Sequence, residues 1–314
     1  MIADSYPLPL RPISDADRAE VAELIYCSIN YWYEVHGRAP IFRGGPGVTE
    51  VFYEVYNDLN PGSSVVAVNP RNGRLMGACF YHPREHHVGL GIMAVHPNYF
   101  CQGVGRALLA HVVDFADANH YKSVRLTQSA LNVESFSLYN KAGFVPRYAF
   151  QDMIIEVPAT GFAGRMPGMN RVRAARLEDV PAMGALEMEV SGISRVADYR
   201  YCIENRRGYW HGSVIEGSGG TIDGFLICCS HPAMTMLGPG VSRTEVDAAA
   251  LVCRGLDVLR GRTPVVLIPT DKEHLVRQMY AWGARNCEMH FCQVRGPMQP
   301  FRGVSLPSFL PETA

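Results

Sequence analysis

The sequence predicts an α/β (α+β) protein whose second half repeats the fold of the first. The chain has 314 residues, which corresponds to two domains at about 150 residues each. In the first half, an apolar strand (88–95), a glycine-rich turn and an apolar helix from Arg106 follow one another directly. A similar order of strands and helices recurs after residue 171. Such internal similarity is typical of a repeated unit.

The composition excludes several classes of protein. The formal net charge is −1 and the sequence pI is about 6.8, so we expect no positive field that would attract nucleic acid or an anionic membrane. The nine cysteines form no C-x-x-C pair, which favours free thiols in a reducing compartment. The first ten residues lack the basic and apolar regions of a signal peptide, and no apolar run is long enough to span a membrane. We therefore expect a cytoplasmic protein.

Turn residues and apolar periodicity divide the rest of the first half into short elements. Ser14-Asp15 is a helix cap, and it predicts a helix over 16–30. The turn signal Asn69-Pro70-Arg71-Asn72-Gly73 predicts a hairpin between two strands. In chain order, the predicted elements are a strand at 10–12, helices at 16–30 and 50–59, strands at 64–68, 75–81 and 88–95, a helix from 106, and strands at 123–127 and 148–157.

The turn Gln102-Gly103-Val104-Gly105-Arg106-Ala107 has the properties of a phosphate-binding site. Glycines let the backbone approach a ligand closely, and a helix start offers unpaired N–H groups at the positive end of the helix dipole. The dinucleotide pattern G-x-G-x-x-G is excluded because Leu108 stands at the third glycine. The P-loop is excluded because no Gly-Lys-Ser/Thr ending is present.

The pattern that fits is Q/R-x-x-G-x-G/A, with Gln102, Gly105 and Ala107 at its fixed positions. Val-His-Pro precedes it, and Asn132 and the run Leu138-Tyr139-Asn140-Lys141-Ala142-Gly143-Phe144 follow it. In this order of motifs the chain resembles the GNAT superfamily of N-acetyltransferases, over about half of its length. The resemblance implies acetyl-CoA as cofactor and two tandem GNAT-like domains, the second degenerate. Each domain would have a mixed, mostly antiparallel central sheet flanked by helices.

The resemblance also implies roles for individual residues. The central strand would carry a bulge, with the Met93 N–H facing the thioester oxygen and Val95 bonding the pantetheine amide. Asn132 would touch the pantetheine arm, and Tyr139 would protonate the departing sulfur. The residues that the resemblance places at the cofactor are Met93, Ala94, Val95, Gln102, Gly103, Val104, Gly105, Arg106, Ala107, Asn132, Tyr139 and Lys141.

The general base is not specified in this way. Many relatives carry a glutamate six residues before the position of Val95, where this chain has Gly89. Glu85 and His87 lie just upstream, and His82 stands at the preceding turn. A histidine has a suitable ordinary pKa, and a water chain to a more distant residue is an alternative. The histidines and the glutamate here lack regular metal-ligand spacing, so we expect a solvated hairpin tip and no metal.

An aromatic and basic segment (31–46) follows the first helix. In GNAT-like folds this part of the chain lines the acceptor site, where we expect Tyr31, Trp32, Arg38 and Arg43. The arginines would suit an acceptor that carries a carboxylate or a phosphonate. A packed aromatic loop without a binding role is the alternative.

The domain boundaries follow the repeat. We predict a GNAT acetyltransferase domain at 1–157, a linker at 158–170, a degenerate GNAT-like domain at 171–296 and a tail at 297–314. The degenerate domain has no match to the loop pattern in 236–242, and Met279 stands where the first half has Tyr139. We therefore expect it to shape the acceptor site or a dimer without doing chemistry.

The combined interpretation is an acetyl-CoA-dependent N-acetyltransferase. It would transfer an acyl group to the amine of a small molecule by direct attack in a ternary complex. A non-catalytic acyl-CoA-binding module would explain the absent strand glutamate, and a protein or peptide N-acetylase would need an open groove. The expected partners are the amine acceptor and, in an assembly, a second copy of the chain.

Overall fold

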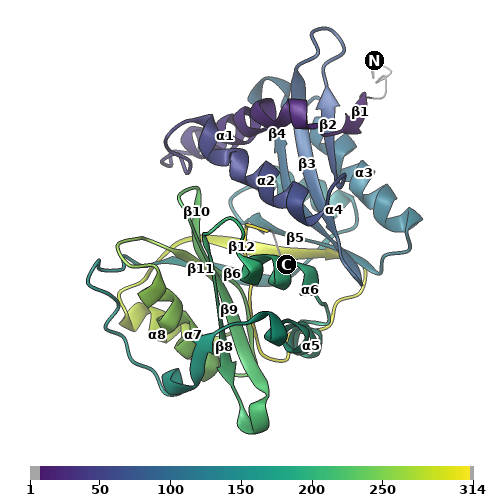
Figure 1. Ribbon diagram of the computed structural model, residues 1–314. Helices are drawn as coiled ribbons and strands as arrows, with labels where there is room; N and C mark the ends of the chain where they lie inside the picture. Colours follow the sequence, from purple (N-terminus) through teal and green to yellow (C-terminus); the bar gives the residue numbers. More distant parts are fainter. Residues whose placement is uncertain (1–7, 312–314) are drawn as a thin grey trace. The chain divides into compact units, whose positions relative to one another are not determined.

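The computed structural model describes residues 8–311, and its two halves repeat one order of elements (Figure 1). Each half runs strand, two helices, three strands, helix, strand, helix, strand. The first half contains β1 (Leu10–Pro12), α1 (Arg18–Val35), α2 (Glu50–Leu59), β2 (Ser64–Val68), β3 (Leu75–Pro83), β4 (His87–Val95), α3 (Val104–Ala118), β5 (Ser123–Ser129), α4 (Val133–Lys141) and β6 (Val145–Ile154). The second half contains β7 (Val172–Ala174), α5 (Val180–Ser191), α6 (Val196–Glu204), β8 (Trp210–Glu216), β9 (Ile222–His231), β10 (Met234–Ser242), α7 (Glu245–Val258), β11 (Val265–Pro269), α8 (Glu273–Ala281) and β12 (Arg285–Arg295), and β13 (Val304–Leu306) follows it. The predicted α/β class and the internal repeat are confirmed.

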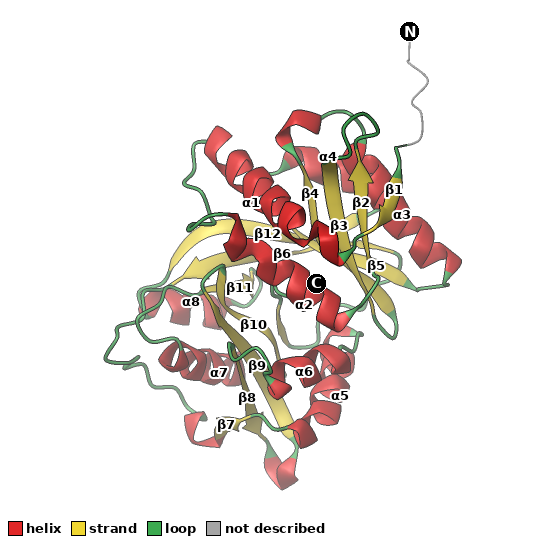
Figure 2. Cartoon of the chain, turned by 45° about the horizontal axis from the view of Figure 1, so that its top comes forward, coloured by secondary structure: helices red, strands yellow, loops and turns green. Residues whose placement is uncertain are grey.

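The compact units of the chain do not follow the repeat. One unit runs up to Pro83 and includes Val88–Val124, and the other contains Arg84–His87 and everything from Arg125 onward. The reason is the pairing of β6, which lies between two strands of the second half, β12 on one edge and β11 on the other (Figure 2). The last strand of the first half is therefore built into the sheet of the second unit.

In the first unit, β1, β2, β3 and β4 form an antiparallel sheet in that order. Side chains alternate along β3, so its two faces take different partners. Phe80 packs against Tyr56 of α2, with ring centroids 5.0 Å apart. Tyr81 points the other way and packs against Phe115 of α3 at 4.9 Å. The helices therefore cover both faces of this sheet.

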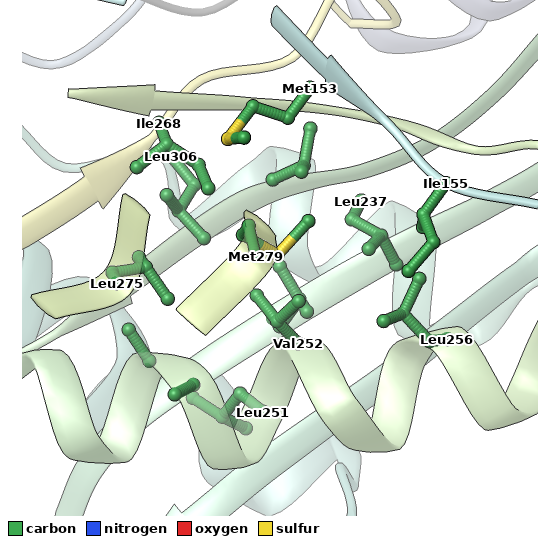
Figure 3. Packing of buried hydrophobic residues seen from close by; sticks show 14 of the residues in the cluster. Met153, Ile155, Leu237, Leu251, Val252, Leu256, Ile268, Leu275, Met279 and Leu306 are labelled. Atoms are coloured by element: carbon green, nitrogen blue, oxygen red, sulfur yellow. The ribbon is translucent and has the colours of Figure 1, made fainter. Parts of the chain in front are cut away.

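In the second unit, the strand order is β5–β12–β6–β11–β10–β9–β8–β7, with β10 and β11 parallel. Helices α7 and α8 pack their apolar faces on these strands, and Figure 3 shows Val252 of α7 beside Met279 of α8. Ile155 and Leu306 belong to the same buried cluster. Full burial of such side chains stabilises a fold by about 1.5–3 kcal/mol each. The C-terminal tail, whose structure the sequence did not predict, is thus part of this core.

The repeat extends to individual ion pairs. Arg11 donates two hydrogen bonds to the Asp17 carboxylate, both 2.7 Å long. Arg173 donates two to Asp179, 2.7 and 2.8 Å long, with the same spacing along the chain. Each carboxylate also accepts a backbone N–H at 2.8 Å from three residues before it. The similarity of the two segments in sequence therefore reflects one shared structure, a strand tied to the start of the next helix.

The Arg11–Asp17 pair offers a test of acid stability. Its hydrogen bonds hold the pKa of Asp17 well below the ordinary value. The pair therefore stabilises the fold above about pH 4, and this contribution is lost as the pH falls further. Asp17→Asn should lower the free energy of unfolding at pH 7 by on the order of 1 kcal/mol. The expected loss is this small because solvent screens the half-exposed arginine.

Urea unfolding at pH 7 and at pH 3 measures this effect. The difference between wild type and Asp17→Asn should be full at pH 7 and smaller, but not zero, at pH 3, because the pKa of Asp17 in the folded protein lies well below that of the unfolded chain. Asp114→Asn, at an exposed position of α3, is the control and should match wild type at both values. An equal loss at both pH values would show that the Asp17 charge does not contribute.

Candidate active site

The start of α3 presents free backbone donors, as the glycine pattern predicts. Gly103 is the N-cap residue and has the left-handed conformation, with φ of 81°. The first backbone bond of the helix joins the Ala107 N–H to the Gly103 carbonyl at 3.0 Å. The N–H groups of Val104, Gly105 and Arg106 therefore have no acceptor within the helix. The first turn contains no acidic residue, so the positive end of the dipole is not offset by a carboxylate.

Close packing fixes this helix start against the sheet. A Cβ atom at Gly77 of β3 would lie 2.8 Å from Val104 Cγ1 and 2.9 Å from the Ala94 carbonyl oxygen. Only glycine leaves room for both neighbours. The end of β4 and the start of α3 thus meet over one glycine, a residue that the sequence analysis did not single out because its role depends on a contact distant in sequence. The Gln102 side chain donates to the Asn98 carbonyl at 2.9 Å and ties the turn together.

The central strand β4 carries the bulge that the resemblance implies. Cys79 of β3 pairs with Met93, whereas Tyr81 pairs with Leu90, so β4 has one extra residue between them. Gly91 lies in the bulge, where a Cβ atom would come within 3.1 Å of the Phe80 carbonyl oxygen. Bulges turn the local backbone groups and are common beside active sites. Met93, Ala94 and Val95 follow directly and lead into the Val-His-Pro turn.

The predicted acceptor segment differs in structure from the expectation. Helix α1 continues to Val35, five residues beyond the predicted end at Asn30, because no helix breaker occurs before Gly37. Asn30 does not cap the helix. Its buried side chain exchanges two hydrogen bonds of 2.9 Å with the backbone of Phe42 and so holds the following loop against the helix.

The four predicted acceptor residues lie on α1 and this loop. Tyr31 is half exposed and its ring centroid lies 6.1 Å from that of Phe100, which precedes the phosphate-binding turn. Trp32 instead stacks on His36 at 4.3 Å. Arg38 and Arg43 are both exposed. Tyr31 is therefore the member of this group that the structure brings near the turn.

Asn132 caps α4, and Tyr139 and Lys141 lie on it, all in the second compact unit. Asn132 is the N-cap, and its side-chain oxygen accepts the Ser135 N–H at 2.9 Å. Tyr139 is buried, with 6% of its surface exposed, and its ring centroid lies 5.9 Å from that of Phe144. Lys141 is exposed at the end of the helix. Tyr139 therefore packs inside the unit, whereas Lys141 does not.

The two candidate bases have opposite surroundings. The Glu85 side chain is 70% exposed, and its Oε1 atom lies 3.6 Å from Nε2 of His86. His87 is 2% exposed, and burial, followed by the nearby Arg125, Arg195 and Arg84, lowers its pKa well below the ordinary value. His87 is therefore neutral at pH 7 but accepts a proton reluctantly. Within residues 8–311, no group of three His, Cys, Asp or Glu side chains could hold a metal ion.

The second half closes the corresponding helix start. The N-cap of α7 is Thr244, whose hydroxyl accepts the Asp247 N–H at 3.1 Å. Asp247 and Glu245 place two carboxylates in the first turn, and the Glu245 carboxylate accepts the Leu275 N–H at 2.8 Å. Negative charge and a bonded cap make this helix start a poor site for phosphate.

The tail occupies the strand edge beside that helix. β10 pairs with β11 only at Met236 and Leu237, and β13 pairs with β10 beyond them, at Gly240, Val241 and Ser242. In the first half, the resemblance places the pantetheine arm beside the strand that corresponds to β10. The tail therefore fills the edge where a second cofactor would lie.

Met279 occupies the place in the second half that Tyr139 occupies in the first half, as predicted. The Phe144 N–H donates to the Tyr139 carbonyl at 3.1 Å, and the Ala284 N–H donates to the Met279 carbonyl at 3.0 Å. The intervening Gly143 and Gly283 both have φ of 88°. Met279 is fully buried in the core, so the second half has no hydroxyl at this place.

Comparison with known proteins agrees with this arrangement. The model of the acetyltransferase (GNAT) family matches residues 29–144. A GCN5-related N-acetyltransferase from Sphaerobacter thermophilus has a TM-score of 0.62 at 18% identity, over 95% of this chain and 99% of that one. A tandem GNAT protein from the clavulanic acid biosynthesis pathway has a TM-score of 0.60 at 15% identity, over 92% and 99%. These likenesses show the fold, two GNAT-like domains in tandem.

Two further similarities are of different kinds. A candidate acetyltransferase from Pyrococcus horikoshii has a TM-score of 0.73 at 14% identity, over 99% of this chain and 95% of that one. The UPF0157 protein YqkA of Bacillus subtilis (strain 168) is 31% identical over 91 residues, which are 29% of this chain and 26% of that protein. The match thus spans about a quarter of that relative.

No helix among the described residues is long and apolar enough to cross a membrane.

Proposed function

We propose, from the match of residues 29–144 to the acetyltransferase (GNAT) family, that the chain transfers the acetyl group of acetyl-CoA to the amine of a small molecule. The uncapped start of α3 carries the proposal. Its left-handed Gly103 and its three free N–H groups suit the pyrophosphate of coenzyme A. The capped, acidic start of α7 supports one cofactor per chain.

In the proposed reaction, the amine nitrogen attacks the thioester carbonyl carbon directly. A carbon–nitrogen bond forms, the carbon–sulfur bond breaks, and the amine loses one proton to a base or to water. The Met93 N–H would stabilise the negative charge that develops on the carbonyl oxygen. Tyr139 would donate a proton to the departing thiolate of coenzyme A. Much of the rate enhancement in such a reaction comes from holding the two reactants in the right geometry. A weak base such as His87 is therefore compatible with turnover.

A small acceptor is supported by the residues around α1. Tyr31 and Phe100 present an aromatic surface before the phosphate-binding turn, and the two exposed arginines, Arg38 and Arg43, would attract an anionic group.

A non-catalytic acyl-CoA-binding module is a second candidate, because Gly89 occupies the place of the usual glutamate.

A panel of amines tests this function. Purified full-length protein is mixed with acetyl-CoA and each amine, and the release of free coenzyme A thiol is followed. Small amines should give release above the rate without acceptor. Thiol release only with peptides would assign a peptide N-acetylase. No release with any amine, together with measurable acetyl-CoA binding, would favour the non-catalytic module.

A further inference from the structure

Seven polar side chains from separate parts of the sequence meet in the interior of the second compact unit. They come from the β3–β4 turn, from the start of β4, from β5, and from α5, α6 and the connection between these helices. Each is at least nine-tenths buried. The residues are Arg84, His87, Arg125, Glu187, Ser191, Arg195 and Asp198. We call this group the buried arginine cluster.

Two of its arginines are neutralised inside the cluster. Arg84 donates to the Asp198 carboxylate from Nε at 3.1 Å and from Nη2 at 2.8 Å. Arg195 donates to the Glu187 carboxylate from Nε at 2.6 Å. These pairs use both carboxylates of the cluster.

The third arginine, Arg125, has no carboxylate partner among residues 8–311. Its Nη1 atom lies 3.5 Å from the Ser191 carbonyl oxygen, and its Nε atom is buried without a hydrogen-bond acceptor. Burial lowers the pKa of Arg125, yet a guanidinium stays protonated in a protein. Because His87 is neutral, the cluster carries three positive and two negative charges, and one positive charge is not balanced.

Buried charges are normally paired, since an unpaired one is strongly destabilising. Further atoms in the cluster also lack partners among the described residues, namely Arg195 Nη1, His87 Nδ1, Ser191 Oγ, Asp198 Oδ1 and Glu187 Oε2. The cluster therefore combines positively charged donors with two carboxylate oxygens, Asp198 Oδ1 and Glu187 Oε2, that can each accept a hydrogen bond. A small anion with a donor group of its own complements this set.

We propose that the buried arginine cluster binds a small carboxylate that also carries a hydroxyl or amine group. The carboxylate pairs with Arg125, whose planar fork matches two oxygen atoms, and the hydroxyl or amine donates to one of the two unpartnered carboxylate oxygens, Asp198 Oδ1 or Glu187 Oε2. The bound ligand brings the cluster to neutrality. This proposal concerns binding alone and does not depend on acyl transfer.

Thermal unfolding of the full-length protein with two matched probes tests the proposal. Glycolate carries a carboxylate and a hydroxyl, and ethylene glycol has similar size but no charge. Overnight incubation precedes each scan, because ligand access to a buried site requires local opening. Millimolar glycolate should raise the Tm by about 2–4 °C relative to sodium chloride of equal ionic strength, and ethylene glycol should not. Equal shifts with both probes, or none with glycolate, would overturn the proposal.

Substitutions locate the effect. Arg125→Met removes the unbalanced charge while keeping the volume, so it should abolish the glycolate shift and leave the unliganded protein at least as stable as wild type. Arg206→Met, at an exposed arginine paired with Glu204, is the control and should keep the full shift. If Arg125→Met does not fold, Arg125→Lys takes its place and should weaken glycolate binding at least tenfold, because lysine lacks the fork. A full glycolate shift in the substituted protein would place the bound anion elsewhere.

Discussion

Replacing Gly105 with glutamate should abolish the binding of coenzyme A. Gly105 is the second residue of α3, in the turn whose N–H groups have no acceptor within the helix. A glutamate there puts a negative charge and a side chain where the pyrophosphate would lie. The expected loss is at least 100-fold in affinity, which is about 2.7 kcal/mol. Calorimetry should find one equivalent bound by wild type and none by Gly105→Glu.

The substitution should not harm the fold. An acidic residue in the first turn stabilises a helix by about 0.3–1 kcal/mol, and glutamate is a better helix former than glycine. The Tm of Gly105→Glu should therefore equal or exceed that of wild type, which separates lost binding from lost structure.

The second half supplies the matched control. Val246 is the second residue of α7 and is 49% exposed. Val246→Glu should leave coenzyme A binding at one equivalent, because Thr244 and the acidic first turn already close that helix start. Two equivalents in wild type, one of them lost in Val246→Glu, would show that both halves bind the cofactor.

The parts of the site that sequence patterns predicted are those built within one short segment. A glycine N-cap and a helix start depend on neighbours a few residues away, so the motif around Gln102–Ala107 is enough to predict them. The replacement of Tyr139 by Met279 was also predicted, because the glycine that ends each helix fixes the count back to the side chain.

Other parts of the structure depend on contacts that no local pattern encodes. β6 pairs with two strands of the other half, and nothing in its own sequence distinguishes these partners from strands of the first half. The tail pairs with β10 for the same kind of reason. The burial of Arg125 could not be predicted, because a single arginine in an apolar strand is uninformative and its neighbours come from α5 and the α5–α6 connection, which are distant in sequence.

Tyr139→Phe should lower turnover by about 100-fold and leave coenzyme A affinity nearly unchanged. The hydroxyl is needed only when the thiolate departs, so its loss removes an interaction of the transition state and appears in kcat. The phenylalanine ring keeps the buried packing against Phe144, and the fold should be retained.

Tyr280→Phe is the matched control. Tyr280 lies on α8, next to the residue that corresponds to Tyr139, and is 48% exposed. Its hydroxyl donates to Gln151 at 3.3 Å, and its loss should change kcat by less than twofold. The measurement is steady-state turnover with a responsive amine, alongside calorimetry with coenzyme A. If Tyr139→Phe turns over within twofold of wild type, Tyr139 is a packing residue and water protonates the thiolate. If it loses coenzyme A affinity instead, its hydroxyl supports the bound cofactor and not the chemical step.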